Sequence, residues 1–208
     1  MQFHVWNQIN VISKGKYCFQ RFVNDRSQTS FTNFFDCYFA RLTSFAVTIL
    51  KSEILAEEVV LDVFLRLWEK RNSLEHINNI ETYLYISVRN KSISILKSEH
   101  GFSFNMLDDL SVQLMTYEPS AENELIENEM FARLNEAVNQ LPSKCKIIFK
   151  LIREDGLNRN EVAHILNISV KTVDNQIAIA VQKIAQKLNI DLSNPKNSRG
   201  LTSFLFSL

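Results

Sequence analysis

The chain has 208 residues, which is enough for one large domain or two small ones that each bury a core. Hydrophobic residues make up 46% and charged residues 22%, as in ordinary globular proteins, while only 4 Gly and 3 Pro are present to break helices. The formal net charge of zero at first argues against a nucleic-acid partner.

The zero average conceals an uneven distribution of charge along the chain. Residues 1–98 hold 12 Lys/Arg and 9 Asp/Glu, and residues 133–190 hold 9 and 5. The segment between them, residues 99–132, holds no Lys/Arg and 8 Asp/Glu. Two mildly basic blocks that flank an acidic one indicate different partners for different segments.

The cysteines and the absence of targeting signals favour a cytoplasmic protein. Cys18, Cys37 and Cys145 are odd in number and have no metal-ligand spacing, so three reduced, mostly buried thiols are expected and no metal site. The N-terminus lacks the features of a signal peptide, and no apolar stretch reaches the roughly 18 residues of a membrane span. We therefore expect no direct membrane insertion.

Residues 1–29 show no clean period and are expected to be an N-terminal extension of uncertain order. A helical block follows over residues 30–98. Ser30 is predicted to cap its first helix, in which apolar residues recur at helical spacing. Ser52 is predicted to cap the second helix.

The second helix, "SEILAEEVVLDVFLRLWEKR", has apolar residues almost all the way round. A surface helix normally carries one apolar stripe, so a second apolar face needs a second partner. Two interpretations stay open: the helix is buried on both sides within its own domain, or its outer face binds another protein, which requires that face to be exposed.

The polar loop "RNSLEHINN" and a third long helix, "IETYLYISVRNKSISILK", complete this block. Tyrosines and basic residues surround an apolar face of Leu84, Val88 and Ile95. Basic residues interleaved with aromatics suit single-stranded nucleic acid, because bases stack on rings while cations meet phosphates. A solvated helix face with tyrosines in the core explains this helix equally well.

Residues 99–132 are predicted to form an acidic linker that gives way to helix near its end, because their periodicity is weak. A second helical block follows over residues 133–190. Within it Pro142 separates two helices and Gly156 ends one of them. Residues 191–208 are left as a C-terminal tail.

The stretch "EVAHILNISVKTVDNQIAIAVQKI" predicts a helix-turn-helix. Asn158 and Glu161 form a capping-box-like pair before its first helix, and Ser169 opens the second. The apolar face of the second helix recurs at helical spacing: Val173, Ile177, Ala180, Ile184 and Leu188. The opposite face carries amides and a lysine, which suit base edges in the major groove. An ordinary helical hairpin is the alternative.

The two helical blocks, in this order and at this distance, resemble the extracytoplasmic-function group of the sigma-70 family of bacterial RNA polymerase initiation factors. The resemblance covers about residues 31–97 and 134–188. It implies an all-α protein of two small helical domains joined by the acidic linker, with the helix-turn-helix in the C-terminal one.

The resemblance also implies three sets of site residues. The second helix would dock on the largest polymerase subunit through Glu58, Leu61, Asp62, Leu65 and Arg66. The loop and third helix would melt and capture the −10 element through His76, Ile77, Asn78, Asn79, Tyr83, Tyr85, Arg89, Asn90 and Lys91. The helix-turn-helix would read the −35 element through Ser169, Lys171, Thr172, Asn175, Gln176 and Ile179.

The partners implied by the resemblance are core RNA polymerase, promoter DNA and an anti-sigma factor, and the acidic linker would thread the basic RNA-exit path. No paired carboxylates, nucleophile constellation or phosphate-binding glycine loop occurs, so neither an enzyme nor a cofactor or small-molecule substrate is expected. We predict a sigma factor that directs promoter-specific initiation. The alternatives are a stand-alone helix-turn-helix regulator with a sensing or dimerisation domain, and a sigma-like decoy that occupies polymerase.

Overall fold

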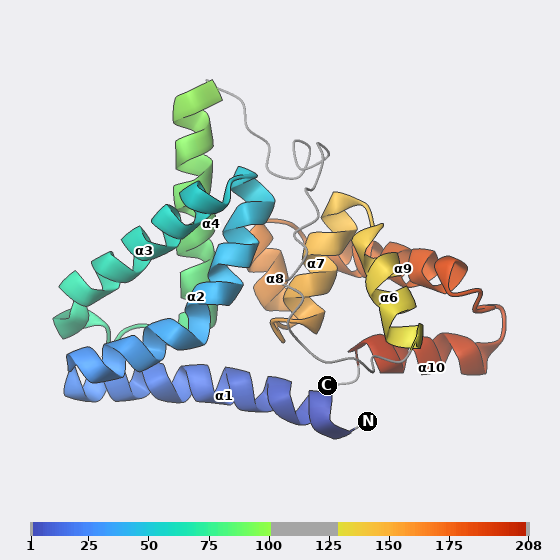
Figure 1. Cartoon of the computed structure of the whole chain (residues 1–208), viewed down its shortest axis with the longest axis horizontal. Coiled ribbons are helices and arrows are strands. Elements are labelled where there is room, and N and C mark those ends of the chain that lie inside the picture. Colours follow the sequence, from blue (N-terminus) through green and yellow to red (C-terminus); the bar gives the residue numbers. More distant parts are fainter. Residues whose placement is uncertain (1, 101–128, 207–208) are drawn as a thin grey trace. The chain divides into compact units, whose positions relative to one another are not determined.

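The structure is a computed structural model that describes residues 2–100 and 129–206. Every regular element in these ranges is helical, which confirms the predicted all-α fold (Figure 1). The chain divides into two compact units, and the main boundary between them falls within residues 101–128. Most of the predicted acidic linker therefore lies outside the described residues.

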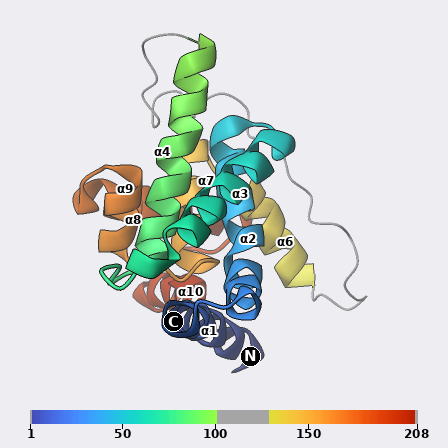
Figure 2. The same cartoon turned by 90° about the vertical axis from the view of Figure 1, so that its left-hand side faces the viewer.

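The N-terminal unit contains four α-helices: α1 (Gln2–Asp25), α2 (Gln28–Leu50), α3 (Glu53–Glu69) and α4 (Ile80–His100). A 3-10 turn, η1 (Arg71–Ser73), begins the loop between α3 and α4. Helix α2 packs against α1, α3 and α4, and α3 also packs against α4 (Figure 2). Fully buried aromatic side chains from all four helices form the core: Phe22, Phe34, Tyr38, Phe64 and Tyr85.

The expectation for residues 1–29 is corrected by the structure. Residues 2–25 form α1, whose C-terminal half buries Phe19, Phe22 and Val23 in the core of the unit, and residues 28–29 already belong to α2. The ring of Phe22 stacks on Phe34 of α2 with 5.9 Å between centroids. These apolar residues span little more than one turn, so the sequence window was too short to show a period.

The predicted cap of α2 is displaced by one turn. Ser27, not Ser30, is the N-cap: its hydroxyl accepts a hydrogen bond from the backbone N–H of Ser30 at 3.2 Å. Ser30 is buried inside the first turn, and its own hydroxyl donates to the carboxylate of Asp25. Either serine has a side chain that can cap a helix. Ser30 instead contacts Asp25 at the end of α1, and Ser27 is the cap.

The boundaries of α3 and α4 follow the local chemistry of capping residues. Ser52 caps α3 as predicted, and its hydroxyl accepts a hydrogen bond from the N–H of Leu55 at 3.4 Å. The side chain of Asn79 accepts a hydrogen bond from the N–H of Thr82 at 3.1 Å at the start of α4. Each contact satisfies one of the backbone donors that a helix start leaves free.

The C-terminal part of the described chain contains α6 (Glu129–Asn139), α7 (Ser143–Arg153), α8 (Arg159–Leu166), α9 (Val170–Lys187) and α10 (Pro195–Phe206). Helix α9 packs against α6, α7 and α10. The predicted C-terminal tail is therefore corrected: it contains α10, which buries Leu201 and Leu205. Among the described side chains of α10 only these two leucines are buried, and two apolar positions are too few to predict a helix from periodicity.

Gly156 and the pair Asn158 and Glu161 take the roles that the sequence predicts in the turns after α7. Gly156, with φ of 66°, follows α7, and Asn167, with φ of 58°, makes the turn between α8 and α9. Asn158 and Glu161 exchange two backbone-to-side-chain hydrogen bonds of 2.8 and 3.0 Å, so the capping box is confirmed.

Three smaller features bear on the classes of function. The three cysteines are free, as expected, and Cys18 and Cys145 are buried. No described helix is long and apolar enough to cross a membrane. Within residues 2–100 and 129–206, no group of His, Cys, Asp or Glu side chains gathers in a way that could hold a metal ion.

Candidate polymerase and DNA interfaces

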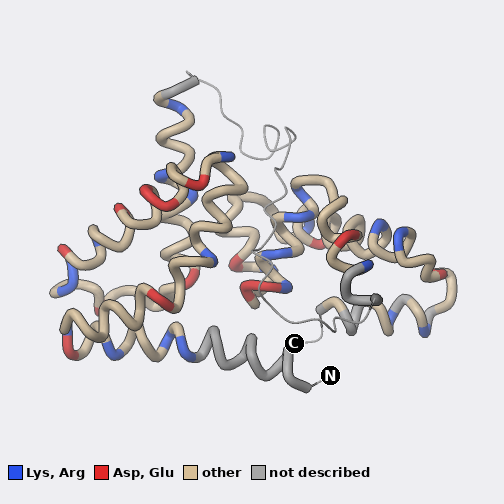
Figure 3. The backbone as a smooth tube through the Cα atoms, viewed as in Figure 1, with Lys and Arg blue, Asp and Glu red and all other residues tan. Residues whose placement is uncertain are grey.

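Helix α3 carries one buried face and one exposed apolar face. The buried face is made by Ala56, Val59, Val60, Val63, Phe64 and Leu67. On the opposite side Ile54, Leu61 and Leu65 are 80%, 50% and 54% exposed, and the exposed carboxylate of Glu58 lies between them in the sequence. Figure 3 shows further acidic residues along the same helix. Of the two interpretations of this helix, the structure supports the exposed outer face.

Asp62 does not stand free on that outer face. Its carboxylate pairs with Lys91 of α4 at 2.8 Å and with Arg66 one turn further along α3 at 3.2 Å. The hydrogen bond from Lys91 holds the pKa of Asp62 below its usual value. This carboxylate joins α3 to α4, whereas Arg66 is exposed at the edge of the face.

The two tyrosines predicted to stack on bases from α4 have opposite environments. Tyr83 is 38% exposed, so its ring is accessible. Tyr85 is fully buried, and its ring packs edge-on against Phe45 of α2 with 5.1 Å between centroids. A base cannot stack on a ring inside the core, so the assignment of Tyr85 to DNA is wrong. It is a core residue that positions α4.

The remaining residues predicted for the −10 element lie along the loop and α4. His76 and Asn78 are exposed, Ile77 is half-buried, and Asn79 is also engaged as the cap of α4. Further along the helix Asn90 is exposed and Arg89 is half-buried, while Lys91 is held by Asp62. Tyr83, Asn90 and the two exposed loop residues therefore have the accessible side chains of this set.

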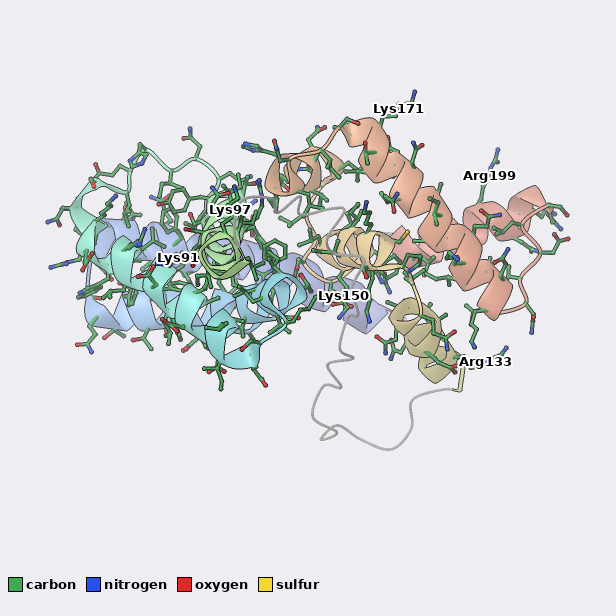
Figure 4. All side chains as sticks on the ribbon, turned by 90° about the horizontal axis from the view of Figure 1, so that it is seen from above. Lys91, Lys97, Arg133, Lys150, Lys171 and Arg199 are labelled. Carbon is green, nitrogen blue, oxygen red and sulfur yellow. The ribbon has the colours of Figure 1, made fainter. Side chains whose placement is uncertain are left out.

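Helix α9 separates core and solvent cleanly. Its core stripe, Val173, Ile177, Ala180 and Ile184, is buried as predicted, and Leu188 is half-buried just beyond the helix. Lys171 and Asn175 are exposed on the other side, and Ile179 is 37% exposed. Figure 4 shows Lys171 projecting away from the start of the helix. The cap is Ser169, whose hydroxyl accepts a hydrogen bond from the N–H of Thr172 at 3.0 Å.

Gln176 differs from the rest of this predicted reading face. Its amide oxygen accepts a hydrogen bond from the thiol of Cys145 on α7 at 3.0 Å, which turns the side chain toward the inside of the unit. Burial raises the pKa of that thiol, so it stays protonated and able to donate at neutral pH. Gln176 is half-buried, and its amide is already engaged in part.

Two residues beside the predicted reading face were not named from the sequence. Val170 is 38% exposed at the first position of α9. Arg159, at the start of α8, pairs with the exposed Asp174 of α9 at 3.0 Å and neutralises the only acidic residue of that helix. The helix-turn-helix brings these two charges together from residues fifteen positions apart in the chain.

The comparison with protein families decides the identity of the chain. It matches the family description "Sigma-70 region 2" over residues 34–101 and "Sigma-70, region 4" over residues 131–184, together more than half of the chain. The chain belongs to the sigma-70 family. The order of the two regions and the linker between them agree with the predicted extracytoplasmic-function group.

Individual relatives of this sigma factor are distant. It is 24% identical to the ferric citrate uptake sigma factor FecI of Escherichia coli over 164 residues, which are 77% of this chain and 94% of the relative. Its fold is similar to that of the sigma factor RpoE of Bartonella quintana, solved in complex with the anti-sigma factor NepR. That similarity has a TM-score of 0.52 and 20% identity, and it covers 77% of this chain and 98% of that one.

The family gives the chain its general function. A sigma factor binds core RNA polymerase and promoter DNA and directs transcription initiation. Sigma factors regulate transcription and are not themselves enzymes. The comparisons assign these roles to the matched regions, residues 34–101 and 131–184. Neither α1 nor α10 lies within a matched region.

Proposed function

We propose that the exposed apolar face of α3 is the surface through which this sigma factor docks on core RNA polymerase. The observation that carries the proposal is the row Ile54, Leu61 and Leu65, all at least half exposed and set on one side of a helix whose other side is buried. Burying such a row against a partner removes apolar area from water, which stabilises the complex. Glu58 and Arg66 supply polar contacts at its rim.

The two DNA contacts are divided between the units. Tyr83, Asn90 and the loop residues His76 and Asn78 hold the unpaired −10 strand, since they are the accessible side chains of their set. Lys171, Asn175 and Ile179 of α9 enter the major groove at the −35 element. Thr172 and Ser169 cap the start of α9, where free backbone N–H groups also favour a phosphate.

Three further assignments complete the proposal. The acidic linker follows the basic RNA-exit path of polymerase, because eight negative charges and no positive one suit such a channel. The chain acts in the cytoplasm, where polymerase is. An anti-sigma factor binds the chain and holds it inactive; a complex of a sigma factor with an anti-sigma factor is known for RpoE and NepR.

The decisive experiment measures the affinity of the full-length chain for core polymerase. Leu61→Glu and Leu65→Glu should each raise the Kd at least about 30-fold, because central apolar contacts of an interface contribute about 2 kcal/mol or more. Tyr17→Glu is the matched control: it places the same charge at an exposed aromatic residue of α1, 64% exposed, and should leave the Kd unchanged.

Two results would contradict the docking assignment. One is an unchanged Kd for both leucine variants while circular dichroism and thermal unfolding match the wild type. The other is an equal loss for Tyr17→Glu, which would indicate a general effect of added charge. The stand-alone regulator makes the first of these predictions, since it has no need of an exposed apolar face on α3.

A further inference from the structure

The loop between α3 and α4 is held from both of its ends by α1. Before the loop residues His76–Asn79, Glu75 pairs with Arg26 at 2.6 Å. After them, Glu81 pairs with Lys16 of α1 at 3.3 Å. The four charged residues therefore bracket the segment that the proposed function places against the −10 strand, and both cations lie outside the regions that match the family.

The contact at Glu81 is the more firmly built of the two. The side chain of Glu81 is 4% exposed, and the hydroxyl of Tyr38 donates to its other oxygen at 3.4 Å. Helix α1 comes very close to α2 here: a Cβ on Gly15 would lie 2.5 Å from the hydroxyl oxygen of Tyr38. The lack of a side chain at Gly15 therefore permits the close approach of α1 to α2 that brings Lys16 next to Glu81.

The contact at Glu75 is exposed and depends on backbone geometry. Arg26 follows α1 in the left-handed conformation, with φ of 54°, and this ends the helix and directs its side chain to the loop. Both side chains are more than a third exposed, so the pair is weak by itself and is screened by salt. Its effect is on the position of the loop more than on stability.

Between these two ends the loop is not packed tightly on α1. A pocket of about 270 Å³ separates them, lined by Gln20, Asn24 and Val23 of α1 and by Leu74 and Ile77 of the loop. Leu74 is buried at the start of the loop, whereas Ile77 is half-buried and His76 and Asn78 are exposed, so apolar packing fixes the start of the loop and not the residues after it. The polar contacts at the ends then determine where it lies.

We infer that Lys16 and Arg26 are positioning residues for −10 recognition: α1 sets the conformation of residues 74–79 and thereby the selectivity of this sigma factor for the bases of the −10 element. This inference rests on the proposed role of that loop. Neither residue touches DNA, so both act by holding Glu81 and Glu75. Loss of either contact lets the loop sample other positions and weakens its discrimination between bases.

The test uses holoenzyme assembled from the full-length chain, with Lys16→Gln, Arg26→Gln and, as matched control, Lys14→Gln. Lys14 is an exposed lysine of the same helix, outside the pocket and both ion pairs, so its loss removes the same charge. Open complexes are measured on one promoter and on single-base variants of its −10 element. A good base contact discriminates about tenfold to a hundredfold, and we expect this ratio to fall several-fold in Lys16→Gln and less in Arg26→Gln.

Exchanging the two charges of the Arg26–Glu75 pair distinguishes loss of this contact from a general effect on folding. Arg26→Glu should lose discrimination, and adding Glu75→Arg should restore it, because the exposed pair can form in either direction. Discrimination equal to that of Lys14→Gln in all variants, or an equal loss on every −10 sequence, would overturn the inference. Failure of the proposed function is seen separately, as a wild-type holoenzyme that does not form or opens no promoter.

Discussion

Helices α4 and α9 are both expected to meet DNA, yet their sequences predicted their contacts with different success. In α9 the residues opposite the apolar stripe are exposed, as at Lys171 and Asn175. In α4, Tyr85 is buried and Lys91 is held by Asp62, while Tyr83 is accessible. The difference lies in particular contacts: Tyr85 packs on Phe45 of α2 and Lys91 pairs with Asp62 of α3, and neither contact can be seen in the sequence of α4 alone.

The largest expected effect is a difference in the free energy of unfolding between substitutions of the two tyrosines of α4. Tyr85→Ala removes a fully buried ring and should lower the free energy of unfolding of the N-terminal unit by about 3–5 kcal/mol. Tyr83→Ala should change it by no more than about 0.5 kcal/mol, but should reduce promoter opening. Both tryptophans of the chain, Trp6 and Trp68, precede the linker, so tryptophan fluorescence in a urea titration follows this unit.

Permanganate reactivity of the −10 thymines measures opening in the same pair of variants. A Tyr83→Ala holoenzyme that opens the promoter normally would remove the one accessible ring from the proposed −10 contact. Equal losses of stability in both variants would mean that the two environments of α4 do not differ as described.

The next effect concerns base reading by α9. Asn175→Ala should weaken binding to the correct −35 sequence by about 1–3 kcal/mol and change binding to substituted sequences little, because an exposed amide can pair with one base in the major groove. Gln176→Ala should have a smaller effect, since its amide oxygen is engaged by Cys145. Holoenzyme binding to single-base variants of the −35 element measures both.

If Asn175→Ala weakened all sequences alike, the amide would act as a general contact and the face that reads bases would lie elsewhere on α9. A larger loss for Gln176→Ala than for Asn175→Ala would show that the contact with Cys145 opens when DNA binds.

The smallest effect compares two lysines through salt. Lys171 is exposed without an ion pair among the described contacts, so Lys171→Ala should lower the dependence of log K on log salt by about one unit. Lys91 is paired with Asp62, so Lys91→Ala should change the slope much less. Promoter binding between low and moderate salt gives both slopes. Equal decreases would mean that Asp62 releases Lys91 to a phosphate in the bound state.

The local boundaries of this protein could be predicted because they depend on neighbours in the sequence. Ser52, Ser169 and the pair Asn158 and Glu161 each bind backbone donors three residues away. The same holds for Asn167, whose left-handed backbone needs only a residue that tolerates it. The cap of α2 is the exception, because there the packing of α1 buries Ser30.

The two apolar faces of α3 could likewise be predicted from the sequence, but the sequence did not show which face is buried and which is exposed. Periodicity states which residues share a face, and it does not state what covers that face. The structure leaves Leu61 and Leu65 exposed and buries Val60 and Phe64, so the surplus of apolar residues becomes a candidate docking surface.

By itself the sequence determined the helices of the two matched blocks, the caps at Ser52 and Ser169, the division into two helical blocks and the family motifs, since these follow from spacing and local hydrogen bonding. The tertiary structure alone decided that Tyr85 is core, that Asp62 joins Lys91, and that α1 holds the loop before α4 through Lys16 and Arg26. Those facts depend on which helix lies beside which, and residues tens of positions apart carry no local signal that they will meet.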